Sequence, residues 1–431
     1  MQMDLNTTVN KSVPYKAKLF YMFMMFLWVA SVSPLTGFNF GNNPVLMPVY
    51  LLILFLYYCA YCKKKYAPLM IFVFLFFLWY GLNCFKYGFA QTIQFQPLYS
   101  IVIAHVAFNI YSVDEFIKFY EKVLIKLCVL SLVVWFCANI IGEPFVKFMH
   151  TIAVVENQPP TETYSFLVGL GSQFEMGLRR NIGFTWEPGK FSCWILLGIY
   201  LNLVKNNFVL SIRKNKNLYI LLITLLTTLS TTGYAVLAIN ILFVIMNKKN
   251  KMLKIFVIVV CALIVPTIWA LPFMREKFLA LMDLDAGYRE IEYYNSVVKE
   301  SIVCPQRFTG AYMSFQNFIH DFWLGFNQLE KSYASAVIFK GAVIVAPSEG
   351  IINIFAKYGF FVGVTFYWAL LSSSKLIART LNYKGIYVFA LFFLSISFSY
   401  DFWENCILMF FYLSAFYKKF DSRYFEKERL S

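Results

Sequence analysis

Charged residues are scarce in this chain of 431 residues. They make up 14% of it, against 60% hydrophobic residues, and the mean hydropathy is +0.62. Soluble domains average roughly 45–50% apolar residues, and a soluble core of this length could not bury so much apolar surface. The composition therefore excludes a soluble fold and predicts an all-α, polytopic membrane protein.

Cysteines are few and follow no pattern that would hold a metal or a disulfide framework. The nine cysteines are scattered and lie mostly inside apolar runs, where cysteine behaves as a small hydrophobe. Cys59 and Cys62 form a Cys-x-x-Cys pair only in the middle of the apolar stretch "LLILFLYYCAYC". We therefore expect neither a metal nor a cofactor.

Acidic residues are absent from the middle of every predicted span. Proton- and ion-coupled transporters usually carry carboxylates or histidines inside the membrane as relays. This absence argues against an ion-coupled pump or exporter. A flippase for lipid-linked oligosaccharides, working through charge in a central cavity, stays open as a non-enzyme alternative.

Apolar runs near the roughly twenty residues that a bilayer requires occur about twelve times. They are placed at 18–35, 45–62, 67–85, 97–111, 123–142, 189–205, 217–230, 232–247, 254–271, 349–371, 385–400 and 404–417. The stretch 217–247 is interrupted by "STTG", so it predicts either two short helices or one long helix with a break.

Positive charge gathers in every second connection, for example at 63–65, at 205–216 and in the tail from Lys418. The alternate short connections "GFNFGNNP" and "DFWEN" contain no Lys or Arg. By the positive-inside rule the basic connections and both termini are cytoplasmic. The formal net charge of +15 thus reflects membrane topology and does not indicate nucleic-acid binding.

Two predicted outer (periplasmic) loops are far longer than the about two to eight residues usual between packed helices. Both are rich in aromatic residues and mixed charge, which favours ordered structure. The predicted organisation has five parts. These are N-terminal helices in 1–142, an outer loop in 143–188, central helices in 189–271, a large outer loop in 272–348, and C-terminal helices with a basic tail in 349–431.

Arginines stand where these loops meet the membrane. Arg179 and Arg180 come shortly before a predicted span, and the larger loop supplies Arg289 and Arg307. Guanidinium is always charged and offers a planar fork of donors, so it suits a phosphate or pyrophosphate held at the membrane surface. The alternative is pairing with loop carboxylates or lipid headgroups. Arg180 and Arg289 are the two that we favour as pyrophosphate ligands.

Four motifs follow one another between residues 177 and 365. They are "RRNIGFTWEPGKFSCWIL" (179–196), "LLTTLSTTGYAVLAI" (225–239), "HDFWLGFNQL" (320–329) and "APSEGIINIFAKYGFFVG" (346–363). In this order they resemble the bacterial O-antigen polymerase and ligase superfamily, integral membrane glycosyltransferases that act on undecaprenyl-pyrophosphate-linked glycans. The resemblance implies a GT-C-like fold in the bacterial inner membrane and a metal-independent transfer at its outer face.

Two departures from the family pattern bear on the branch. Ser348, with Glu349 beside it, stands where ligases of the family carry a histidine, and Thr231 or Thr232 replaces an arginine of the second motif. The resemblance therefore implies a Wzy-type polymerase of O-antigen, capsule or exopolysaccharide units, with O-antigen ligase as the alternative. The implied partners are an undecaprenyl-pyrophosphate-linked oligosaccharide, membrane lipids and a chain-length regulator.

Transfer of a sugar from a polyprenyl pyrophosphate needs a base for the acceptor hydroxyl and cations for the departing pyrophosphate. Glu187 and Glu349 are the candidate catalytic bases, each at an outer helix entrance. Pro188 biases Glu187 away from helical geometry, so Glu187 is expected to lie in a turn. Alternatively, Ser348 caps the following span and Glu349 only favours the positive end of that helix.

Three further residues are candidates. Lys357 lies about two turns below the outer surface, where it either joins Arg179, Arg180 and Arg289 on the pyrophosphate or extends back to the interface. His320 and Arg307 in the large loop are candidates on the acceptor side. For His320 the alternative is a structural hydrogen bond.

Overall fold

The computed structural model describes most of the helical regions of the chain. The described residues are 13–31, 46–62, 66–88, 96–153, 155–157, 162–164, 167–171, 174–175, 177–246, 302–305, 307–326, 329–339, 344–347, 349–382 and 385–420, with isolated positions at 255, 279, 289 and 293. Ser348 and nearly all of the predicted span 254–271 lie outside them.

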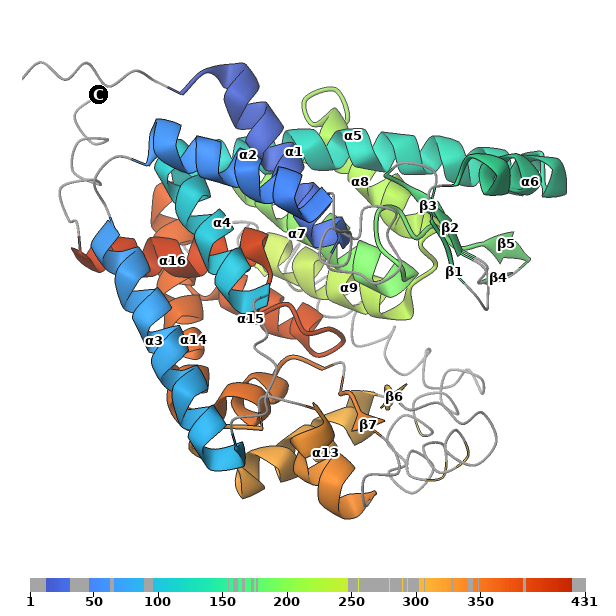
Figure 1. Cartoon of the computed structure of the whole chain (residues 1–431). Coiled ribbons are helices and arrows are strands. Elements are labelled where there is room, and N and C mark those ends of the chain that lie inside the picture. Colours follow the sequence, from blue (N-terminus) through green and yellow to red (C-terminus); the bar gives the residue numbers. More distant parts are fainter. Residues whose placement is uncertain are drawn as a thin grey trace, which may run out of the picture.

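The described part is mostly helical (Figure 1). Its longer helices are α1 (Tyr15–Ser31), α2 (Leu46–Tyr61), α3 (Tyr66–Tyr87), α4 (Gln96–Ile110), α5 (Val113–Ile140), α6 (Glu143–Ile152), α7 (Pro188–Lys205), α8 (Lys216–Thr227), α9 (Thr231–Met246), α13 (Arg307–His320), α14 (Asn353–Thr380), α15 (Val388–Ser397) and α16 (Cys406–Phe420). All but α6 and α13 coincide with predicted apolar runs.

Short strands, which the sequence did not predict, occur in the two long loops. They are β1 (Val155–Asn157), β2 (Glu162–Tyr164), β3 (Gly169–Leu170), β4 (Phe174–Glu175), β5 (Leu178–Arg179), β6 (Ile302–Val303) and β7 (Ile344–Val345). Strands β1 to β3 form an antiparallel sheet, β4 and β5 form a hairpin, and β6 pairs with β7 in parallel. A 3-10 turn (Leu329–Lys331) and a π turn (Ala334–Ile338) follow α13.

Three helical segments among the described residues are long and apolar enough to cross a membrane: Leu69–Tyr87, Val113–Ile140 and Asn353–Thr380. Six other apolar helices there are shorter, at 10–17 residues. These lengths support an all-α membrane protein. The twelve spans, the GT-C-like arrangement and the orientation of the termini stay predictions.

The interruption at "STTG" separates two helices. Helix α8 ends at Thr227 and α9 begins at Thr231. Between them Leu229 has a φ of 48°, a left-handed conformation that a helix cannot continue through. The structure therefore has two short helices here and not one long helix.

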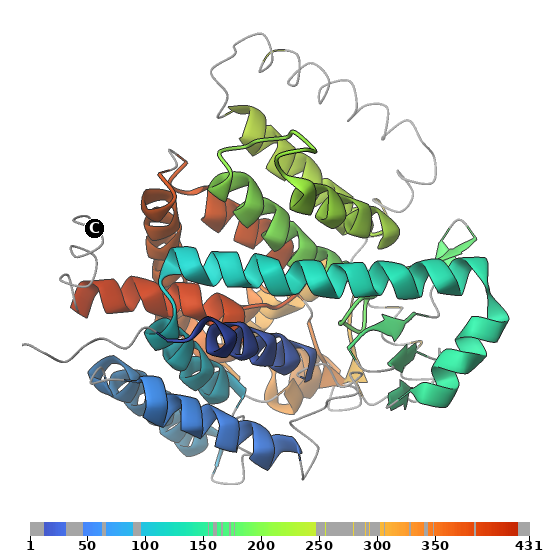
Figure 2. The ribbon, with the colours of Figure 1, turned by 90° about the horizontal axis from the view of Figure 1, so that it is seen from above.

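Helix α5 has 28 residues, and its far end supports the strands of the first long loop. It begins with a capping box in which the Ser112 hydroxyl accepts from the Glu115 backbone N–H, and the Glu115 carboxylate accepts from that of Ser112. At its other end the chain turns back through Gly142 into α6 (Figure 2). The Trp135 indole donates to the Arg179 carbonyl at 2.6 Å, which fastens the β4–β5 hairpin to this end of α5.

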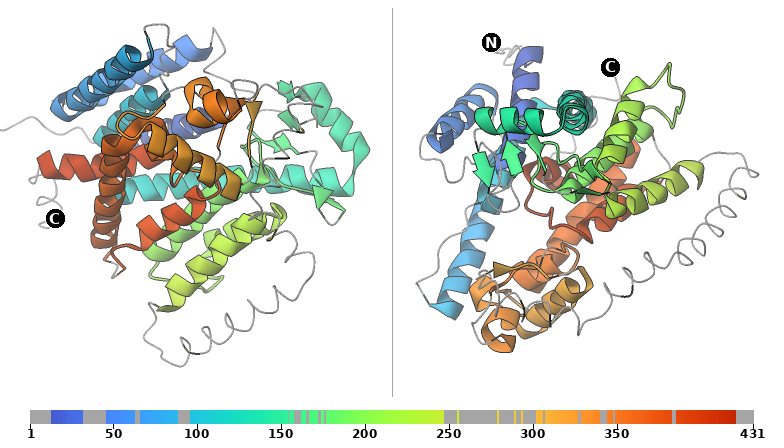
Figure 3. Two further views of the ribbon diagram at one scale, coloured as in Figure 1. Left: turned by 90° about the horizontal axis from the view of Figure 1, so that it is seen from below. Right: turned by 90° about the vertical axis from the view of Figure 1, so that its right-hand side faces the viewer.

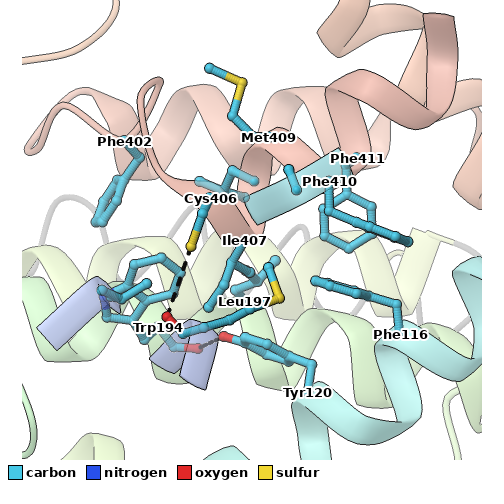
Figure 4. Packing of buried hydrophobic residues seen from close by; sticks show 14 of the residues in the cluster. Phe116, Tyr120, Trp194, Leu197, Phe402, Cys406, Ile407, Met409, Phe410 and Phe411 are labelled. Carbon is cyan, nitrogen blue, oxygen red and sulfur yellow. Dashed lines mark hydrogen bonds between the residues drawn. The ribbon is translucent and has the colours of Figure 1, made fainter. Parts of the chain in front are cut away.

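The core is dense in aromatic side chains where α5, α7 and α16 meet (Figure 4). The ring of Phe116 stacks on that of Phe410 with centroids 3.7 Å apart. The Tyr120 hydroxyl donates to the Trp194 carbonyl at 2.9 Å. Helix association inside a bilayer depends on such packing and on buried hydrogen bonds, because lipid tails are as apolar as the side chains.

Helix α14 is interrupted near its start, in contrast to the unbroken run predicted at 349–371. Gly359 has a φ of 81° and a ψ of 176°. A Cβ built at this residue would lie 2.1 Å from the Trp323 carbonyl oxygen, because residues 322–326 of the large loop fill the break. There the Phe360 N–H donates to the Phe322 carbonyl at 2.8 Å, and the Phe326 N–H to the Ala356 carbonyl at 3.0 Å.

The same loop segment is held from the other side by α3. The Trp79 indole donates to the Leu324 carbonyl at 3.0 Å, and Lys86 forms an ion pair with Asp321. Figure 3 shows α13 lying across this end of α14. The end of α13, the start of α14 and the end of α3 thus lie close together.

Candidate functional site

Glu187 lies in the turn that starts α7. Its φ of −140° and ψ of 136° are extended, as the following proline predicts, and Pro188 opens the helix. The Glu187 carboxylate accepts a hydrogen bond from the Tyr400 hydroxyl at 2.6 Å. Arg307 Nη2 lies 3.9 Å from the same carboxylate oxygen. A predicted catalytic residue therefore meets two side chains from distant parts of the sequence.

Arg307 comes from the large outer loop, at the first position of α13. Its guanidinium stacks over the Tyr400 ring, with 4.6 Å to the ring centroid. The Arg307 side chain is 26% exposed and that of Glu187 24% exposed, so solvent and small polar groups can reach both. The two long loops thus meet at Glu187 through Arg307.

Lys190 adds a second cation to this group. It stands in the first turn of α7, 5.9 Å above the Trp186 ring, and interacts electrostatically with both Glu187 and Asp401. The N-terminal end of a helix carries partial positive charge, which Lys190 reinforces. Lys190 thus adds positive charge beside the carboxylates of this corner.

Asp401 follows Tyr400 in the connection between α15 and α16. Its carboxylate accepts from the Asn353 side chain at 3.1 Å and from the Trp403 N–H at 3.2 Å. Burial and the neighbouring Glu404 together raise the pKa of Asp401 to about 6, against the opposing effect of Lys357. Asp401 therefore gains its charge close to neutral pH.

Lys357 forms an ion pair with Glu404, and the Tyr358 hydroxyl donates to the same carboxylate at 2.5 Å. The Lys357 side chain is 19% exposed. The structure shows a fixed, largely buried ammonium at the edge of the site. Its role as a ligand of the pyrophosphate stays a prediction.

Glu349 is fully buried at the junction that leads into α14. One carboxylate oxygen accepts from the Ile352 N–H at 3.0 Å, the arrangement expected of a residue that favours the positive end of a helix. Burial raises the pKa of this carboxyl, and that backbone N–H acts against the shift. A catalytic role for Glu349 stays a prediction, and Ser348 lies outside the described residues.

Three of the four sequence motifs come together around these side chains. Ser192 of the first motif lies 3.4 Å from Ser230 of the second, measured between the hydroxyl oxygens. The Gly350 N–H of the fourth motif donates to the Ser397 carbonyl at 2.6 Å. The Ser399 hydroxyl, beside Tyr400, lies 3.4 Å from that of Thr232.

Two buried polar atoms beside Asp401 have no hydrogen-bond partner in the described part of the chain. They are Asn353 Oδ1 and the Ser397 hydroxyl. Leaving a buried polar atom unpaired costs about 1–3 kcal/mol, so such atoms usually find a partner.

Arg179 and Arg180 stand on the approach to Glu187 and contact backbone carbonyls. Arg179 donates to the Gly171 carbonyl at 3.3 Å and lies 4.7 Å above the Phe174 ring. Arg180 Nε donates to the Thr228 carbonyl at 3.1 Å, in the α8–α9 connection. Both arginines therefore fasten the loop through backbone carbonyl groups.

The remaining predicted residues lie elsewhere. Arg289 is an isolated exposed position whose surroundings lie outside the described residues, so its convergence with Arg180 stays a prediction. His320 ends α13 and stacks on the Tyr333 ring with centroids 3.5 Å apart. The contact is a ring stack and not the hydrogen bond named as the alternative, and a role of His320 on the acceptor side stays a prediction.

An apolar cavity of about 320 Å³ lies between α3, α14 and α16. Trp79, Phe361 and Phe416 are among its walls, and Glu404 stands in its lining next to Tyr358. The cavity therefore runs from an apolar region to the Lys357–Glu404 pair.

Sequence reasoning missed Tyr400, Asp401, Glu404 and Lys190. The first three lie in "SYDFWEN", a connection noted only because it contains no Lys or Arg. Two carboxylates and a tyrosine within five residues of one another, in a short outer turn, were the available signal. No group of three or more His, Cys, Asp or Glu within the described residues is arranged to hold a metal ion.

The chain was compared with known proteins. No protein-family model matches it, and no curated protein is significantly similar to it in sequence. The resemblance to O-antigen polymerases and ligases therefore rests on the four motifs.

Proposed function

We propose that the chain is a membrane glycosyltransferase of the O-antigen polymerase type. It would transfer a growing glycan from undecaprenyl pyrophosphate onto a lipid-linked repeat unit at the outer face of the bacterial inner membrane. The observation that carries this proposal is the meeting of Glu187, Arg307 and Tyr400 at the start of α7. It joins a carboxylate, a guanidinium and a phenol in a partly open site.

In this mechanism Glu187 acts as the general base. It takes the proton of the acceptor hydroxyl as that oxygen attacks the anomeric carbon of the donor, and the bond from that carbon to the pyrophosphate oxygen breaks. Undecaprenyl pyrophosphate leaves with the bonding electrons. The hydrogen bond from Tyr400 fixes the orientation of the carboxylate.

Cations stabilise the charge that builds on the pyrophosphate. Arg307 and Lys190 lie at the site itself, and Arg179 and Arg180 stand on the approach to it. Preorganised donors of this kind typically contribute about 3–4 kcal/mol of transition-state stabilisation each. With the arginines in this role the proposed reaction uses no metal or cofactor.

The apolar cavity between α3, α14 and α16 suits the first part of the polyprenyl tail. It is lined almost wholly by apolar side chains and ends at the Lys357–Glu404 pair, next to Asp401. A lipid with a long apolar chain and an anionic head matches an apolar cavity that ends at charged side chains.

The proposal is tested with the purified full chain and a synthetic lipid-linked repeat unit, in buffer with EDTA. Products longer than one unit, still attached to the lipid, are expected. The ligase alternative predicts transfer only to a separate acceptor such as lipid A core. In a deletion strain, single repeat units should still reach the cell surface. Units trapped on the inner leaflet would instead indicate the flippase.

A further inference from the structure

A second cavity lies at the opposite end of α7 from Glu187. Helix α7 has 18 residues, so at about 1.5 Å per residue its two ends are roughly 26 Å apart. The cavity has a volume of about 620 Å³ and is formed by α5, the end of α7 and the connection from 206 to 217. It is separate from the candidate active site.

Seven cationic side chains line this cavity, and Glu121 is the one carboxylate in the lining. Lys118, Lys122 and Lys126 come from α5, at intervals of four residues, and all are exposed. Like charges at this spacing lie on one helix face and destabilise the helix by about 0.2–0.5 kcal/mol per pair. The chain tolerates this repulsion at the wall of a cavity.

The opposite wall carries the other cations. Arg213 and Lys214 are exposed on the connection between α7 and α8, the exposed Lys216 begins α8, and Lys205 ends α7. A basic connection alone is what membrane topology requires. Here, however, basic side chains from two sequence-distant segments face one hollow, which topology does not require.

Glu121 does not neutralise this charge, because its carboxylate is already used. It is 5% exposed, accepts from the Asn202 and Asn217 side chains at 2.8 and 2.7 Å, and pairs with Lys205 at 3.2 Å. Its negative charge is therefore compensated within the wall of the cavity. The exposed cations face the cavity without a carboxylate in its lining to match them.

The connection that forms the second wall is held in place by buried amides. Asn215 donates to the Asn202 side chain at 2.7 Å and to the Val209 carbonyl at 3.1 Å, and Asn202 donates back to Asn215 at 3.1 Å. The Phe208 N–H donates to the Leu203 carbonyl at 2.7 Å. The cations of this wall therefore stand on an ordered support and not on a loose loop.

We propose that this cavity binds a phosphate group, free or esterified, on a molecule with net negative charge. An anionic phospholipid headgroup and a soluble pyrophosphate present the same chemistry. Basic pockets between membrane helices on the cytoplasmic side suit anionic headgroups, and each Lys or Arg there contributes about 1 kcal/mol. This inference does not depend on the proposed function.

The test measures binding to the purified full chain in an uncharged detergent at low salt. The probes are dioctanoyl phosphatidylglycerol, dioctanoyl phosphatidylcholine and inorganic pyrophosphate. Phosphatidylglycerol should bind more tightly than phosphatidylcholine, and raising the salt concentration should weaken its binding. Saturation by pyrophosphate at similar concentrations would identify a soluble phosphate as the ligand. Binding of phosphatidylglycerol alone would identify a lipid.

Paired variants separate a site from general positive charge. Lys118→Gln with Lys126→Gln should weaken binding of the preferred probe roughly 30-fold. Arg213→Gln with Lys216→Gln, on the other wall, should do the same. The matched control is Lys375→Gln with Arg379→Gln, two exposed cations at the end of α14 with the same change of charge. Its binding should stay within about twofold of wild type.

The melting temperature of each variant without ligand checks that it has folded. The proposal is overturned if phosphatidylglycerol and pyrophosphate both bind no better than phosphatidylcholine. Equal losses in the control and the cavity variants would also overturn it, because the effect would then come from net charge. A poly-glutamate peptide that binds where neither phosphate probe does would show that the cavity takes acidic protein instead.

Discussion

At its N-terminal end, helix α7 presents Glu187, whose carboxylate is shared between Tyr400 and Arg307. At its C-terminal end, Lys205 belongs to a ring of cations around a cavity whose one carboxylate is already paired. The first site has carboxylates and cations in matched contacts, partly buried and fixed by aromatic rings. The second site has exposed cations, and the one carboxylate in its lining is already paired.

This difference predicts how each end responds to change. Interactions in a low-dielectric site depend strongly on the position of each atom, whereas exposed charges act through the summed potential and are screened by salt. Substitutions at the Glu187 end should therefore act through geometry, even when charge is conserved. At the Lys205 end they should act through charge, even when geometry changes.

The largest effect is expected from Glu187→Gln. The amide keeps the shape of the carboxylate and can still accept from Tyr400, but it cannot take the proton of the acceptor hydroxyl. Removing a general base typically slows a reaction by about 10²- to 10⁴-fold, and we expect such a loss in chain extension on a lipid-linked repeat unit. Glu175→Gln, an exposed carboxylate in β4, is the control and should be close to wild type. Wild-type polymer from Glu187→Gln at equal expression would show that Glu187 is not the base.

The second prediction concerns the break in α14 at Gly359. Gly359→Ala should destabilise the protein by about 3 kcal/mol or more, because the residue has a left-handed φ and its new Cβ would meet the Trp323 backbone. Gly81→Ala in α3 is the control, since a Cβ there meets nothing within 4 Å. The melting temperatures of the two purified variants measure the difference. Equal values would mean that residues 322–326 do not hold the break in α14.

Gly359 also shows where the sequence stopped being informative. The hydropathy of 349–371 predicts a span, and α14 does begin there, but hydropathy carries no information about a backbone reversal. The break depends on a loop segment from before the helix, whose carbonyl groups occupy the position where a helix would continue. Hydropathy depends only on residues that are neighbours in the sequence. It therefore predicts the helices but not a distant loop segment that is inserted into one of them.

The site divides in the same way. Glu187 was found because a glutamate and proline before an apolar run are a local pattern, and Arg307 because arginine in an outer loop is conspicuous. Their meeting was not predicted, and Tyr400 was missed, because it is 213 residues from its partner and lies in a turn that resembles a simple connection. Arg180 was predicted as a pyrophosphate ligand from its charge, its planar donors and its place before a span, and the structure adds a contact with the Thr228 carbonyl that the sequence did not indicate.

A conservative exchange of cations compares the two ends directly. Arg307→Lys keeps the charge but loses the planar group that stacks on Tyr400 and reaches Glu187, so chain extension should fall by about 10- to 100-fold. Arg213→Lys at the cavity keeps the positive charge, through which this exposed side chain acts. Its binding of an anionic probe should change by less than about twofold. Equal tolerance at both ends would remove the distinction between them.

The last prediction is a pH dependence that comes from Asp401. Burial raises the pKa of this carboxyl to about 6, from an ordinary value of 3.8. Below about pH 4 both the folded and the unfolded chain hold the proton, and the buried group costs nothing. As the pH rises from about 4 to about 6, the unfolded chain releases its proton first, so the free energy of unfolding falls by up to about 1.4 kcal/mol per pH unit. Above about pH 6 both states are ionised and the loss stops growing.

Asp401→Asn has no such proton. Its melting temperature should therefore rise relative to that of the wild type between pH 4 and pH 6, and the difference should stay constant above pH 6. Burial also raises the pKa of Glu349, which interacts with Asp401, so Glu349→Gln is measured beside it as a second variant. A lead that does not change with pH would mean that Asp401 is ionised throughout, as a fully paired surface carboxylate would be.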